Sequence, residues 1–328
     1  MKKSAIALAV AGVFAAPMAF AATANVDVYG IMDIAIEDTD AGAGATEVTP
    51  NVISNYSRIG FKGSEDLGNG LKALWQIETA LDLGSGSEIG GTTWAGRNSF
   101  IGLNGGFGTV VAGRHDTPYK LSTGSLDIFG DTLADYNLGR LDGVQLLANG
   151  HDVRNANAVA YISPSFSGLT VAAAVVMDDA AGAADDTADA TSVSATYANG
   201  PMMLTAAYQD LGNAAGADAV NNAWKLGGAY TIGDVRLGAV YEEVSATATT
   251  DRETWLVNAA YTMGPIVLKA QYGEVEVGTS AEADGDMWAI GADYNLSKRT
   301  KAYAVYGVGD DGSTTDVAGW TVGMRHSF

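Results

Sequence analysis

Apolar and polar residues alternate along much of the chain with a period of two. In residues 235–242, the apolar face carries Val235, Leu237, Ala239 and Tyr241, whereas the residues between them are mostly polar or small. The pattern recurs in residues 253–262, 266–273 and 287–294. Because successive side chains of a β-strand point to opposite faces, the alternation predicts strands with one apolar face and one polar face.

Aromatic residues lie at particular places in this pattern, near the ends of the predicted strands and on their apolar face. These residues are Tyr197, Tyr208, Tyr230, Tyr241, Tyr261, Tyr272, Tyr294, Tyr306, Trp224, Trp255, Trp288 and Trp320. Tyr and Trp favour the interface between hydrocarbon and water, so this placement indicates a barrel in a membrane rather than a soluble sandwich.

The connections between the predicted strands are alternately short and long. Residues 199–201 and 263–265 form short turns, whereas residues 38–51, 115–153 and 178–190 form long loops, as is typical of outer-membrane barrels. An even strand count brings both chain ends to the periplasmic side, and about sixteen strands enclose an aqueous lumen. The predicted fold is an all-β, transmembrane antiparallel β-barrel of about sixteen strands. They begin near Asn25, Ser54, Leu71, Arg97, Thr109, Asn155, Leu169, Thr191, Met202, Asn222, Val235, Glu253, Ile266, Met287, Thr300 and Val317.

The first 21 residues follow a different pattern. Lys2 and Lys3 precede an apolar stretch at residues 5–16, and Ala19-Phe20-Ala21 is a small-x-small motif. These features predict a signal peptide at residues 1–21, export through the Sec pathway and one barrel domain at residues 22–328. No later run of about 18 apolar residues occurs, so no transmembrane helix is predicted.

Composition and charge exclude several classes of function. The chain has no cysteine, which excludes disulfides, thiolate metal sites and cysteine nucleophiles. A formal net charge of −20 argues against nucleic-acid binding, which needs a basic surface. Asp38-Thr39-Asp40 and Asp284-Gly285-Asp286 lack the remaining ligands of an EF-hand, so neither a metal site nor a cofactor is predicted.

The loop at residues 115–153 is long enough to indicate a function, because loops of this length are rare in compact folds. Its acids include Asp127, Asp131, Asp135 and Asp142. The neighbouring predicted strands carry several cations, namely Arg58, Lys62, Arg97, Arg114 and Arg154. Arg58, Lys62 and Arg114 have the parity opposite to the apolar positions of their strands, so we expect them to point into the lumen.

Two arrangements of this loop are open. If it folds into the lumen, its acids face a basic wall, and the field across this constriction sorts solutes by charge. If it lies outside, the same cations are ordinary solvated residues of the lumen. We expect the first arrangement.

The chain ends in a strand with Trp320, Val322, Met324, His326 and Phe328 on one face. A terminal Phe after alternating apolar residues resembles the signal that the barrel-assembly machinery reads in bacteria. The polar His326 departs from that pattern.

The chain resembles the Gram-negative general porins, of the trimeric, sixteen-stranded kind. The resemblance runs through residues 26–33, 57–73, 97–114 and 154–164, then Ser297-Lys298-Arg299-Thr300, and finally residues 323–328. It implies an outer-membrane homotrimer in contact with lipid and lipopolysaccharide, passive diffusion of ions and small hydrophilic solutes, and a third loop folded inward. It also implies that Arg58, Arg97 and Arg154 lie near the constriction. Asp127 and Asp131 are assigned to it through Asp127-Ile128-Phe129-Gly130, which is similar to the family's loop.

The sequence leaves four other functions to consider. An enzyme in a barrel would need a nucleophile and a base, yet only three histidines exist and no G-x-S-x-G motif occurs. A secreted lectin-like β-protein, a non-conducting barrel or adhesin, and a substrate-specific channel are the others.

Overall acidity favours passage of cations, and the basic wall favours passage of anions. Total charge does not decide between them, because exposed loop charges are screened beyond about 8–10 Å at physiological salt. We expect a weak preference for cations with little solute specificity.

Overall fold

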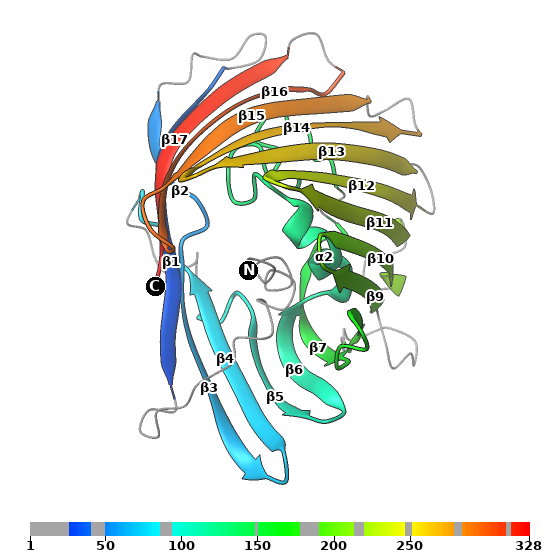
Figure 1. Cartoon of the computed structure of the whole chain (residues 1–328). Coiled ribbons are helices and arrows are strands. Elements are labelled where there is room, and N and C mark those ends of the chain that lie inside the picture. Colours follow the sequence, from blue (N-terminus) through cyan, green and yellow to red (C-terminus); the bar gives the residue numbers. More distant parts are fainter. Residues whose placement is uncertain are drawn as a thin grey trace.

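The computed structural model describes residues 26–40, 50–85, 94–147, 150–177, 190–212, 220–246, 251–278, 284–312 and 316–328. They form a single antiparallel sheet that closes on itself (Figure 1). Its strands are β1 (Asp27–Thr39), β2 (Asn51–Ser54), β3 (Arg58–Gly68), β4 (Leu71–Ala80), β5 (Ser99–Gly105), β6 (Gly108–Asp116), β7 (Arg154–Ile162), β8 (Leu169–Val176), β9 (Ala190–Asn199), β10 (Met202–Asp210), β11 (Val220–Ile232), β12 (Val235–Ala246), β13 (Arg252–Met263), β14 (Ile266–Val277), β15 (Gly285–Asn295), β16 (Thr300–Asp310) and β17 (Val317–Ser327).

The barrel has sixteen strands because β2 and β3 pair with β1 one after the other and form a single interrupted strand. The predicted fold and strand count are therefore confirmed. The interruption was not predicted. At residues 55–57, buried side chains add bonds at the interruption: Asn55 Nδ2 donates to Tyr303 Oη at 2.8 Å, and Ser57 Oγ bonds the backbone of Asp33. Tyr56, between them, has a φ of 51°.

The last strand closes the barrel against the first. β17 pairs antiparallel with β1 from Ile31–Ser327 to Thr39–Gly319. Closure leaves no free sheet edge, and in hydrocarbon each unpaired backbone group would cost several kcal/mol. In the described part of the chain, no helix is long and apolar enough to cross a membrane. Residues 1–25 lie outside the described residues, so the signal peptide stays a prediction.

The outward face of the barrel is apolar and carries a belt of aromatic rings at the loop end of β10–β17. Cross-strand partners in this belt are Tyr208–Trp224, Tyr241–Trp255, Tyr272–Trp288 and Tyr306–Trp320. Ring contacts of 5.2–5.7 Å join successive pairs: Trp224–Tyr241, Trp255–Tyr272 and Trp288–Tyr306. Tyr230, Tyr261 and Tyr294 lie at the opposite, turn end and are 43–49% exposed. The predicted aromatic girdles are thus present on this half of the barrel.

The described residues 117–147 and 150–153, which we name the inner loop, fold into the lumen as predicted. The loop begins with the helix α2 (Pro118–Thr123), capped by Thr117 Oγ1, which accepts from Lys120 N at 3.2 Å. A short 3₁₀ turn, η2 (Gly124–Leu126), follows. Figure 1 shows α2 inside the ring of strands, beside β9–β11.

An apolar core holds the inner loop against the wall formed by β10–β16. The loop contributes Leu126, Phe129, Leu133, Tyr136, Leu141, Leu146 and Leu147, and the wall contributes Met203, Val240, Leu256, Val275, Met287 and Val305. Each fully buried side chain of this size stabilises the arrangement by about 1.5–3 kcal/mol.

Glycines of the wall make room for the inner loop. A Cβ added to any of four wall glycines would lie 2.5–2.8 Å from a loop side chain. The four contacts are Leu126 with Gly227, Phe129 with Gly291, Leu141 with Gly307, and Leu146 with Gly273. The loop is therefore seated in the wall by shape as well as by burial.

Substituting Gly227→Val is expected to displace the inner loop, because overpacking at such a contact costs about 1–3 kcal/mol. Limited proteolysis of the folded protein should cut the loop faster than in wild type. Gly228→Val is the control, since the next residue of β11 faces outward and a Cβ there meets Leu204 Cδ2 at 3.1 Å. Equal cleavage of the two variants would contradict this seating.

Candidate pore constriction

The inner loop packs against β10–β16, so the side of the lumen that it does not fill is bounded by the wall of β3–β7. The sequence-predicted cations lie on or beside these strands: Arg58 and Lys62 on β3, Arg97 before β5, Arg114 on β6 and Arg154 on β7. One loop acid contacts this set. Arg58 Nη1 lies 3.3 Å from Asp131 Oδ2, and their side chains are 18% and 23% exposed.

Asp131 has a second arginine partner that sequence analysis missed. Arg325 on β17 donates from Nη2 to the same Asp131 oxygen at 2.8 Å, and its Nη1 lies 3.6 Å from Asp33 Oδ2. Burial acts to raise the pKa of Asp131, but Arg58 and Arg325 together hold it below its ordinary value. Its carboxylate therefore stays ionised between two cations.

Arg97 and Arg154 are neutralised by acids of the wall rather than of the loop. Arg97 Nε donates to Glu78 Oε1 at 2.6 Å, and Arg154 Nη2 lies 3.0 Å from Asp116 Oδ1. Asp116 also lies 3.6 Å from Lys120 Nζ of α2. Asp116 lies directly across from Arg154 in the β6–β7 pairing, so this partner becomes visible once the register is known.

Lys62 and Arg114 make no recorded contact with the loop acids. Lys62 Nζ lies 5.0 Å from the centre of the Tyr29 ring. Arg114 Nε donates to Gly96 O at 2.8 Å. The parity argument for Arg114 was wrong, because Val111 is 3% exposed and packs inside the barrel with Ala160. The register shifts between Gly113 and His115, so strict alternation does not hold there.

Asp127 and Asp135 serve the inner loop itself. Asp127 Oδ1 accepts from Phe129 N at 3.0 Å, and Asp135 accepts from Asp131 N and Asn137 N at 2.9 and 2.8 Å. Burial and the neighbouring Asp135 raise the pKa of Asp127, and burial raises the pKa of Asp135. We expected several loop acids to face several wall cations. Among the described residues, Asp131 is the loop acid that pairs with one of these cations.

A buried ion pair fixes the end of the inner loop to β11. Lys225 Nζ lies 2.5 Å from Asp152 Oδ1, and neither side chain is exposed. Lys225 Nζ also lies 4.1 Å from the centre of the Tyr119 ring, and Tyr119 Oη donates to Glu242 at 2.7 Å. The pair joins the start of the loop, its end and two wall strands. The sequence did not predict this pair, because an inward-facing charge in a barrel is expected to be solvated unless its distant partner is known.

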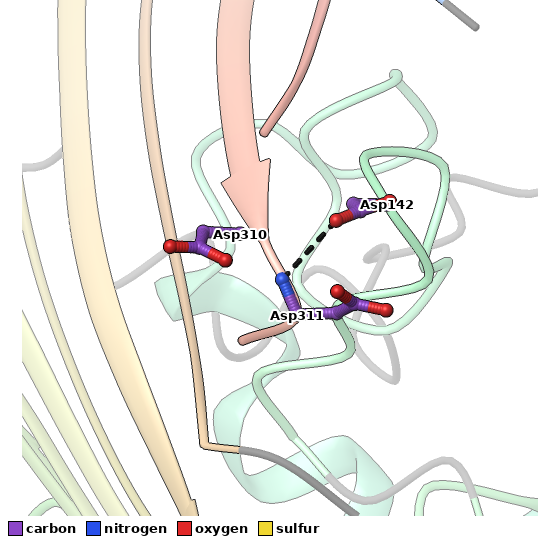
Figure 2. Close-up of side chains that lie close together, drawn as sticks. All are labelled: Asp142, Asp310 and Asp311. Atoms are coloured by element: carbon purple, nitrogen blue, oxygen red, sulfur yellow. Dashed lines mark hydrogen bonds between the residues drawn. The ribbon is translucent and has the colours of Figure 1, made fainter. Parts of the chain in front are cut away.

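Acids gather where the inner loop reaches the loop end of β16. Asp142, Asp310 and Asp311 have carboxylate oxygens within 4.8 Å of one another, and Asp311 N donates to Asp142 Oδ2 at 3.2 Å (Figure 2). Exposed acids of this kind need no ion. They make this end of the lumen negative.

Comparison with known proteins decides the family. A profile of Gram-negative porins matches residues 5–314. The chain belongs to the Gram-negative porin family. It is 31% identical to the major outer membrane protein P.IB of Neisseria lactamica over the full length of both proteins. It is also 38% identical to P.IB of Neisseria meningitidis over 56% of this chain and 51% of that protein.

Solved structures share the fold of this porin. An anion-selective porin from Comamonas acidovorans superposes with a TM-score of 0.76 at 21% identity, covering 92% of this chain and 99% of that one. OmpF of Salmonella typhi gives a TM-score of 0.68 at 18% identity, covering 92% and 97%. The porin therefore lies in the outer membrane and forms a channel for passive diffusion of ions and small hydrophilic solutes. The family indicates a channel rather than an enzyme.

Removing one partner of the buried pair should destabilise the porin. Lys225→Met leaves Asp152 buried without its cation, which is expected to cost about 3–5 kcal/mol. The double variant Lys225→Met with Asp152→Asn should lose less than the sum of the single variants. Unfolding of the refolded protein in denaturant measures all three. Lys301→Met is the control, since its partner Asp293 keeps Lys269 at 2.9 Å. Additive losses would show that the pair does not act as a unit.

Proposed function

We propose that this porin is a general diffusion pore with a weak preference for cations and little specificity for individual solutes. The observation that carries the proposal is the pairing of lumen charges. Arg58, Arg97 and Arg154 each lie within 3.3 Å of a carboxylate, so none of them faces the lumen as an uncompensated cation.

The narrowest section lies beside the Arg58–Asp131 ion pair, which joins the inner loop to the wall at 3.3 Å. Arg97 and Arg154, with Lys62 and Arg114, form the rest of its basic side. Asp127 belongs to its acidic side and contributes negative charge only when it is ionised. Paired charges set up a weaker field across the opening than the same charges unpaired, because partners of opposite sign cancel at a distance. The acids near Asp142 then tip the balance toward cations.

A homotrimer fits the two different outer faces of the barrel. The Tyr–Trp belt of β10–β17 suits contact with lipid. In the described part of β1, β5 and β6, the outer face instead exposes aliphatic side chains, among them Ile36, Ile101, Leu103 and Val110. These suit contact with a second subunit. OmpT of Vibrio cholerae, a structural neighbour at 20% identity, has been solved in a trimer form.

Phe328 supports an assembly role for the end of the chain. Its backbone exchanges two 3.1 Å hydrogen bonds with Gly30 of β1, and its ring is 37% exposed on the outer side. The barrel-assembly machinery would therefore meet this ring before the barrel closes. Residues 1–21 would direct Sec-dependent export beforehand, and lipopolysaccharide would surround the loop end in the finished barrel.

Planar-bilayer recording tests both the pore and its selectivity. Refolded wild-type protein should give stepwise conductance and a small cation-selective reversal potential in a KCl gradient. Arg58→Gln should shift the reversal potential toward cations and Asp131→Asn toward anions, because each removes one charge of the constriction. Lys72→Gln, at the turn end of β4, is the control and should shift it least. Absence of steps would overturn the pore, and a strongly anion-selective wild type would overturn the preference.

Selectivity should also depend on pH. Because the pKa values of Asp127 and Asp135 are raised, both acids are neutral at low pH and gain negative charge as pH rises through those values. Cation preference should therefore increase as pH rises above the ordinary pKa range of a carboxyl group. Asp127→Asn should reduce the increase. The idea fails if the reversal potential of wild type and variant changes equally over this rise in pH.

A further inference from the structure

A cavity of about 140 Å³ lies at the turn between β15 and β16, at the periplasmic end of these strands. Lys298, Arg299, Lys301 and Arg325 line it together with neutral polar side chains, and no acid is among its described lining residues. Lys301 and Arg325 are cross-strand partners whose ammonium and guanidinium groups bond Asp293 and Asp131. Since those acids lie inside the barrel, the cavity opens to the lumen and not to the lipid.

The charge around this cavity is unbalanced. Lys269 and Lys301 share Asp293, at 2.9 and 2.8 Å. Arg58 and Arg325 share Asp131, and Arg325 also reaches Asp33. Within the described chain, Lys298 and Arg299 have no recorded ion pair. Among the lining cations, Lys301 and Arg325 thus have carboxylate partners, whereas Lys298 and Arg299 add positive charge to a protein whose net charge is −20.

The cavity also offers several hydrogen-bond donors. Ser297 Oγ accepts from Arg299 N and Thr300 N at 3.1 and 3.0 Å, so its own hydrogen is left to donate. The ammonium of Lys298 and the guanidinium of Arg299 are donors only. An arginine fork and an ammonium suit the oxygens of a phosphate group.

We propose that this cavity binds the phosphate group of a small soluble oxyanion as it passes the periplasmic mouth. The site rests on the proposed pore, because the anion reaches it through the lumen. Arg325 lines the cavity and also holds Asp131, so it connects the constriction to the site. Free phosphate, rather than a phospholipid headgroup, is the expected source, since the cavity faces water.

The test is a titration of the refolded full-length porin with inorganic phosphate in phospholipid-free detergent, followed by ³¹P line broadening. Wild type should bind saturably. The double variant Lys298→Gln with Arg299→Gln should bind roughly tenfold more weakly, as expected for the loss of charge-assisted hydrogen bonds. Lys72→Gln removes one cation at another turn of the same rim and should change binding less than about twofold. Heat-modifiable migration verifies that each variant is folded.

Two results would overturn the site: unsaturable broadening in wild type, or equal binding by all three proteins. Retention of phosphatidylglycerol by wild type, lost in the double variant while phosphate itself does not bind, would also overturn it in favour of a lipid site. Conductance in KCl is recorded on the same wild-type sample. Phosphate binding without conductance steps would contradict the pore and leave the site standing.

Discussion

In hydrocarbon, every backbone N–H and C=O must find a partner inside the protein, and the rest of this porin depends on how the chain meets that demand. Pairing of β17 with β1 meets it, with Phe328 and Gly30 bonded at the seam. A closed sheet of sixteen strands is too wide for its own side chains to fill. Water therefore fills the interior except where another segment occupies it, and that segment is the inner loop.

Because the inner loop buries apolar side chains, it lies against the barrel wall and not in the centre of the water-filled lumen. Leu126 and Phe129 fit against Gly227 and Gly291, and the Lys225–Asp152 pair fixes the loop where it returns to the wall. The passage is left beside β3–β7, where partly desolvated arginines gain most from close carboxylates. Seating of the loop leaves Arg97 and Arg154 to bond Glu78 and Asp116 of the wall, whereas Asp131 is the loop acid that reaches Arg58.

The barrel could be predicted from the sequence because its rules are local. A period of two, rings at strand ends and alternating loop lengths each act over a few residues, and strand starts such as Leu71, Leu169 and Ile266 coincide with those of the structure. The constriction depends on which residues meet across the lumen. Arg325 lies 194 positions from Asp131, and no local pattern pairs them. For Arg114 the parity premise failed, because Val111 packs inside the barrel and the register shifts between Gly113 and His115.

Charge along the axis matters more in this porin than charge across it. Pairing cancels most of the transverse field, whereas the two ends of the lumen differ in sign. Asp142, Asp310 and Asp311 gather at the loop end, and Lys298 and Arg299 are unpaired within the described chain at the turn end. Pairing across the lumen removes a barrier to either ion, because neither sign meets an uncompensated charge at the narrowest point. In the function we propose, the acidic end concentrates cations before entry, and the basic end holds anions at the exit. A total of −20 is therefore compatible with weak selectivity, since the acids that dominate the sum lie where solvent screens them.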